Sequence, residues 1–201
     1  MEKKLNLNGY KCPILINKVP GIPIVFLHGL SYSIKIWQHI GITDLLDTKC
    51  IPYLAIDMPY GEKNLCKPKT RDIEKNVTLT YDAIEHLFGN PIPPVLVGAN
   101  IGGNMILHFA TRFPVKGLIL ISPPHALEKN LTPTYNNFKF PSTIIWGSED
   151  TIIASEDMRT LTDKLPNSKL VIYQDAKHHA YKDKPEQFKH DLLELYIKAE
   201  T

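Results

Sequence analysis

Short apolar runs alternate with segments of helical periodicity along most of this chain, and that alternation restricts the fold more than any other feature. Within each run successive residues are apolar, as in strands buried on both faces of a sheet. The runs lie at residues 22–27, 51–58, 95–97, 118–121, 144–146 and 170–173. Between them apolar residues recur every three or four positions, which is typical of helices that cover a sheet. The pattern predicts an α/β fold with a mostly parallel central sheet and helices on both faces.

The beginning of the chain departs from this alternation. Asn8-Gly9 stands between two short runs that are apolar or alternating, and this dipeptide is a strong signal for a tight hairpin. We therefore expect an N-terminal antiparallel hairpin, followed by a helix over residues 33–47 and, later, another over 104–113. No internal repeat or linker divides the 201 residues, so we expect a single domain over 1–201.

Charge and cysteine content exclude several classes of function. The net charge is +2, from 23 basic and 21 acidic residues, so we expect neither a nucleic-acid partner nor a membrane partner. No apolar run approaches the roughly 20 residues that span a bilayer, and the N-terminus lacks the apolar core of a signal peptide. Cys12, Cys50 and Cys66 are far apart and odd in number, which favours neither a disulfide framework nor a zinc site. The expected location is cytoplasmic.

The turn from residue 97 to residue 103 carries the most chemical information. Gly98 and Gly102 flank Asn100 with the spacing of a nucleophile elbow, G-x-S-x-G, where the glycines let a strand and a helix pass closely. The spacing alone also fits an ordinary strand-to-helix turn, but not a dinucleotide-binding loop, which needs G-x-G. In a nucleophilic enzyme the middle position holds serine, cysteine or aspartate. Here it holds asparagine.

Polar residues at other strand ends decide between these interpretations. His28-Gly29 follows the first central strand, Asp150 follows a late strand, and His178 follows the last one. The order elbow, acid, histidine is that of α/β-hydrolases. From about residue 10 onward the chain resembles that superfamily, and it is most similar to the small lidless members grouped as α/β-hydrolase domain-containing protein 14. The segments that carry the resemblance are 28–38, 56–59, 98–103, 146–150 and 178–188.

The resemblance implies a role for each matching residue. His178 corresponds to the general base, Asp150 to the acid that orients it, and the backbone N–H groups of Leu30 and Ile101 to the oxyanion hole. His178 is preferred over His179 because of its spacing from Pro185. No cofactor and no metal are implied. Asp57 is expected to hold its loop, and the remaining histidines lack metal-ligand spacing and are expected to have ordinary surface or packing roles; they are His39, His86, His108, His125 and His190.

Asn100 leaves three functions open. The first is a serine esterase or deacylase of small acyl esters or amides whose nucleophile is replaced, so that activity is lost or strongly impaired, because a triad without serine loses about 10⁶ in turnover. The second is a non-catalytic binding module, and the third is an enzyme that uses His178 as a general base without a covalent intermediate. The connector over 123–141 is too short for a helical lid, so an open, small pocket and a small-molecule acyl ligand are expected. The sequence does not indicate the oligomeric state.

Overall fold

The computed structural model describes residues 2–89 and 93–201, which include an eight-stranded sheet flanked by helices. The strands are β1 Glu2–Leu7, β2 Tyr10–Asn17, β3 Ile24–Leu27, β4 Tyr53–Ile56, β5 Val95–Ala99, β6 Gly117–Ile121, β7 Ser142–Gly147 and β8 Ser168–Tyr173. The helices are α1 Lys35–His39, α2 Ile42–Thr48, α3 Ile73–Phe88, α4 Ile101–Ala110, α5 Ser155–Lys164, α6 Ala180–Asp183 and α7 Pro185–Glu200, with a 3-10 helix η1 over Thr132–Asn137.

The sheet has the strand order β1-β2-β4-β3-β5-β6-β7-β8. β1 pairs with β2, and β2 with β4, in antiparallel fashion, whereas every pair from β4 to β8 is parallel. The carboxyl ends of the parallel strands therefore meet at one edge of the sheet, where ligand sites of α/β proteins lie. The prediction of a mostly parallel sheet is confirmed.

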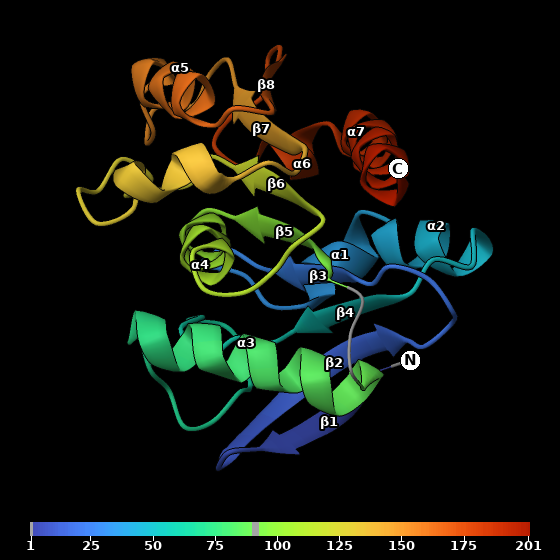
Figure 1. Cartoon of the computed structure of the whole chain (residues 1–201). Coiled ribbons are helices and arrows are strands. Elements are labelled where there is room, and N and C mark those ends of the chain that lie inside the picture. Colours follow the sequence, from blue (N-terminus) through green and yellow to red (C-terminus); the bar gives the residue numbers. More distant parts are fainter. Residues whose placement is uncertain (1, 90–92) are drawn as a thin grey trace.

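Helices cover both faces of the sheet, as Figure 1 shows. On one face α3, α4 and α5 bury side chains such as Val77, Ile106 and Leu161 in a single apolar cluster. On the other face α1, α2, α6 and α7 pack around the fully buried Trp37 in a second cluster. Strands covered on both sides explain why their sequences are apolar at successive positions.

The hairpin between β1 and β2 is confirmed, with Asn8 and Gly9 at φ values of 51° and 79° in its turn. Two helix predictions were wrong in extent. The predicted helix over 33–47 is divided into α1 and α2 at Gly41, which has a φ of 72° that no right-handed helix accommodates. The helix predicted over 104–113 begins instead at Ile101, directly after Asn100. In the connector over 123–141 the helical element is η1, which is far smaller than a lid domain.

The expectation about the cysteines was also wrong, because Cys12 and Cys66 form a disulfide across 54 positions of sequence. Lys11 and Lys67 exchange two backbone hydrogen bonds, of 2.7 and 3.1 Å, and this antiparallel bridge brings the neighbouring cysteines together. Cys50 is exposed and outside that bond. The cysteine count therefore no longer supports a reducing compartment, and the cytoplasmic location stays a prediction from the sequence alone.

Among the residues described, no helix combines the length and the apolar character needed to cross a membrane.

Candidate active site

The turn between β5 and α4 holds Asn100 in a strained backbone conformation. Its φ of 52° and ψ of −120° lie in a region that residues with a side chain rarely adopt. Two glycines make the turn possible: a Cβ on Gly98 would overlap with the backbone of Gly102, and a Cβ on Gly102 would overlap with the carbonyl oxygen of Leu27. The Asn100 N–H donates to the carbonyl of Ile121, at 2.8 Å. The turn therefore has the geometry of a nucleophile elbow.

A Gly98→Ala substitution tests whether this close approach is required. The added methyl group meets rigid backbone atoms rather than a movable side chain, so we expect the free energy of unfolding to fall by about 2–3 kcal/mol. The measurement is urea denaturation followed by circular dichroism. Gly9→Ala is the control. A Cβ at Gly9 would have no heavy atom within 4 Å, so this variant has only the cost of placing alanine at a φ of 79°. That cost in the free energy of unfolding is about 1 kcal/mol. Equal losses in the two variants would contradict a close strand–helix approach.

Asn100, His178 and Asp150 form a chain of hydrogen-bonded side chains. The Asn100 Nδ2 atom lies 2.9 Å from His178 Nε2, and His178 Nδ1 lies 2.9 Å from Asp150 Oδ2. His178 is buried, with 8% of its surface exposed, and the Asp150 carboxylate is fully covered. The three residues come from the ends of β5, β7 and β8, so the sheet brings together positions that are far apart in sequence. The arrangement is that of a base held by an acid and aimed at the elbow.

Local backbone structure fixes the Asp150 carboxylate. Its Oδ1 atom accepts hydrogen bonds from the N–H groups of Ile152, at 2.8 Å, and Ile153, at 3.1 Å. Burial raises the pKa of this carboxyl, but hydrogen bonds from His178, Ile153 and Ile152 outweigh it and hold the pKa below the ordinary value. The charged form is therefore the stable one.

The predicted oxyanion donors belong to two turns that meet at Asn100, the turn after β3 and the start of α4. Ile101 is the first residue of α4, and the N–H groups in the first turn of a helix have no acceptor within that helix. Leu30 follows Gly29, whose Cβ, if it had one, would lie 3.4 Å from the Asn100 Cβ. The turn after β3 thus packs directly against the elbow. The roles of these two N–H groups stay predictions.

His28 has a structural role that the sequence analysis missed. Its ring is fully buried, with Nδ1 2.8 Å from the Gly29 carbonyl, and Nε2 accepts a hydrogen bond from the Met58 N–H at 2.9 Å. Burial lowers the pKa of the ring, so the neutral form persists. His28 therefore ties the turn after β3 to the loop after β4, where the Asp57 carboxylate also accepts from the Ile34 and Leu65 N–H groups, as expected of a loop-holding residue.

This environment of His28 predicts a pH dependence of stability. The unfolded chain binds a proton on His28 near pH 6.5, whereas the folded protein does not, so His28 destabilises the fold as the pH falls below that value. The slope from one such group is at most about 1.4 kcal/mol per pH unit. We expect His28→Gln, whose longer side chain can place an amide oxygen near the present position of Nε2 and accept from Met58, to show a shallower decline in urea unfolding experiments between about pH 7.5 and pH 5. Burial also lowers the pKa values of His108 and His179, but both histidines are present in the variant and in the unchanged protein. Equal slopes of unfolding free energy against pH in the two proteins would therefore refute the role of His28.

A shallow cavity opens beside the site, past the Tyr32 ring. Tyr32 packs edge-on against His179, with ring centres 4.8 Å apart, and His179 in turn contacts His178. The cavity has a volume of about 350 Å³, and its lining includes the ammonium side chains of Lys35, Lys63 and Lys182.

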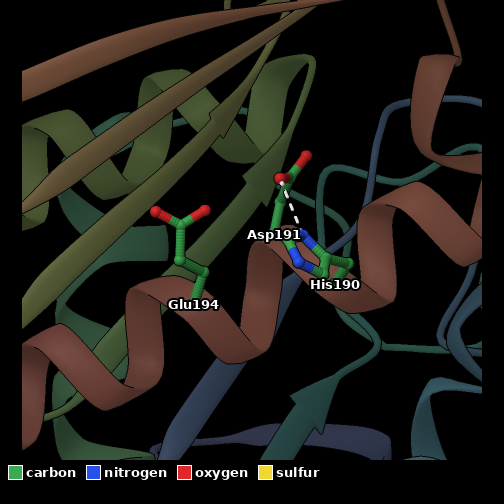
Figure 2. Close-up of side chains that lie close together, drawn as sticks. All are labelled: His190, Asp191 and Glu194. Atoms are coloured by element: carbon green, nitrogen blue, oxygen red, sulfur yellow. Dashed lines mark ion pairs between the residues drawn. The ribbon is translucent and has the colours of Figure 1, made fainter.

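A separate group of metal-type side chains, His190, Asp191 and Glu194, lies on α7 (Figure 2). Its carboxylates already have partners: Asp191 accepts from the Tyr173 hydroxyl at 2.7 Å, and Glu194 pairs with Lys169 and Lys198. The carboxylates of this group thus take part in ordinary hydrogen bonds and ion pairs.

Comparison with known proteins shows which proteins this chain resembles in sequence. Residues 96–187 match the family model described as serine hydrolase (FSH1). ABHD14A of Danio rerio is 28% identical over 185 residues, which cover 90% of this chain and 67% of that protein, so the chain spans about two thirds of this relative. The Homo sapiens protein named "Putative protein-lysine deacylase ABHD14B" is 26% identical, over 86% of this chain and 81% of its own length.

A solved structure shares the whole architecture. The crystal structure titled as a predicted CIB-like hydrolase from Thermoplasma acidophilum superposes with a TM-score of 0.86, covering 98% of this chain and 97% of that one, at 18% identity. At that identity the likeness describes the fold alone. Fold and elbow together define the class of structure: the chain has the α/β-hydrolase fold. Its sequence is similar to those of the ABHD14 proteins.

Proposed function

We propose that this chain has the site of a serine-type esterase or deacylase for small acyl esters or amides, with Asn100 in place of the nucleophile. In this proposal His178 is the general base, Asp150 fixes the imidazole tautomer, and the N–H groups of Leu30 and Ile101 stabilise the oxyanion. A carboxamide has no proton whose removal by His178 yields a useful nucleophile. Covalent turnover is therefore absent or strongly impaired.

One observation carries the proposal. The Asn100 amide nitrogen, one bond beyond the position of a serine Oγ, lies 2.9 Å from His178 Nε2, while His178 keeps its contact with Asp150. These contacts support His178 as the base and Asp150 as its partner, and the turn at Asn100 supports the elbow, so that the nucleophile alone would be missing. The small size of η1 in the connector over 123–141 supports a short acyl group, because little apolar surface surrounds a long chain there. The name of the human relative, "Putative protein-lysine deacylase ABHD14B", supports removal of an acyl group from an amine over hydrolysis of an ester.

Labelling with a fluorophosphonate probe tests the proposal. The probe forms a covalent bond with an activated serine, so the unchanged protein is expected to stay unlabelled and Asn100→Ser to label at position 100. Asn100→Ser combined with His178→Ala is the matched control and is expected not to label, because the serine then lacks its base. An Asn100→Ser protein that folds but does not label would overturn the proposal, in favour of a binding module or a general-base enzyme.

A further inference from the structure

The backbone conformation of Asn100 brings its side chain close to the next peptide nitrogen. At a ψ of −120° the Cβ of an L residue is nearly eclipsed with the following nitrogen about the Cα–C bond, here the nitrogen of Ile101. Helix and strand conformations, with ψ near −42° or +135°, keep these atoms apart. In the elbow, rotation about the Cα–Cβ bond alone brings the Asn100 carboxamide carbon to the Ile101 nitrogen, which is the closure geometry of a five-membered succinimide ring.

The surroundings of Asn100 also supply what ring closure needs. Its Nδ2 atom, which must leave as ammonia, lies 2.9 Å from His178 Nε2, and Asp150 holds that imidazole in place. The attacking N–H of Ile101 stands in the first turn of α4, where no acceptor within the helix competes for it. The positive end of the α4 dipole favours the negative charge that develops on the amide oxygen.

From this geometry we propose that Asn100 is a self-modification site, at which the folded protein converts asparagine to a succinimide and then to an acidic residue. A bond forms between the Ile101 nitrogen and the Asn100 Cγ atom, and the bond from Cγ to Nδ2 breaks. The proton lost by the Ile101 nitrogen passes through His178 to Nδ2, which leaves as ammonia. Water then opens the ring and leaves a carboxylate, either aspartate or isoaspartate. The aspartate form presents a carboxylate nucleophile beside His178.

The bulk of Ile101 does not remove this route. In a flexible chain a branched residue after asparagine slows ring closure, because the chain seldom reaches the reactive conformation. The elbow holds that conformation permanently, and pre-organised reactants gain large effective concentrations. Conversion is therefore expected to be faster in the folded protein than in the unfolded chain. This inference depends on the geometry of the elbow and not on the acyl substrate proposed above.

Peptide mass spectrometry of the aged protein tests the inference. Trypsin releases residues 76–112, which contain both Asn100 and Asn104, the latter buried within the helical part of α4. In native buffer we expect a loss of about 17 Da, followed by a net gain of about one dalton, at Asn100 and not at Asn104. The rate is expected to be about tenfold higher than in urea, and about tenfold lower in His178→Gln.

Control variants and three possible results decide whether Asn100 modifies itself through the elbow geometry. Asn100→Gln, which would need a larger ring, is expected to show neither mass change, and its circular dichroism spectrum reports whether the elbow still folds. An unchanged mass at Asn100 in the aged native protein would overturn the inference. So would a rate in urea equal to or higher than the native rate, or a rate that His178→Gln leaves unchanged. Fluorophosphonate labelling of Asn100→Ser stays independent of all these results, so failure here and failure of the proposed function are distinguishable.

Discussion

Replacing Asn100 by serine is expected to raise kcat/KM for small activated esters by about 10³-fold or more. The serine Oγ would stand near the present position of the Asn100 Cγ, one bond short of the Nδ2 atom that now contacts His178 Nε2, so that the base faces the hydroxyl and can remove its proton. Nothing else in the site has to be rebuilt. The measurement is release of p-nitrophenol from its acetate ester, compared with longer acyl esters.

Two variants control for this gain. Asn100→Ala removes the amide without supplying a nucleophile, and its rate is expected to equal that of the unchanged protein. Asn100→Ser with His178→Ala is expected to lose nearly all of the gain. If Asn100→Ser folds normally and hydrolyses acetate esters no faster than Asn100→Ala, the esterase proposal fails.

The second large effect is expected from Asp150→Asn in the Asn100→Ser background. Asp150 Oδ2 accepts the Nδ1 proton of His178, which leaves Nε2 free to act as the base. An amide at position 150 can instead donate to Nδ1, so that the imidazole proton moves to Nε2 and the base is lost. We expect kcat to fall by about 10⁴-fold, with KM little changed.

Glu149→Gln in the same background is the matched control. This neighbouring side chain is exposed, so the variant removes one negative charge without changing any contact of His178. Its rate is expected to stay within about twofold, because exposed charges act weakly on a buried base. Equal losses in the two variants would mean that general electrostatics, rather than the contact between Asp150 and His178, sustains the activity.

Much of this site could be predicted because its signals are local. The spacing of Gly98 and Gly102 reports a close approach of strand and helix, and positions just after buried strands share one edge of a parallel sheet. Asp150 and His178 could therefore be proposed as partners without any coordinates, and they lie 2.9 Å apart. The start of α4 was placed three residues late because Gly102 and Gly103 are poor helix formers. Close packing against β3 overrides that propensity.

Other features depend on pairings that sequence spacing does not report. The bond between Cys12 and Cys66 follows from the bridge of Lys11 with Lys67, which joins a strand to a loop with no periodicity of its own. His28 stands after an apolar run and could be recognised as a strand end. Its hydrogen bond to Met58 required the loop after β4 to be placed first.

The disulfide also divides the chain topologically. The covalent ring that it closes, residues 12–66, contains the turn of Gly29 and Leu30, whereas Asn100, Asp150 and His178 all lie outside it. A protease cut within the ring would leave the two pieces linked until the bond is reduced. A cut between residue 66 and Asn100 would separate the ring, with its turn against the elbow, from the other three residues of the site. Within the sheet, the pairing of β3 with β5 would then be the strand contact that holds the two parts together.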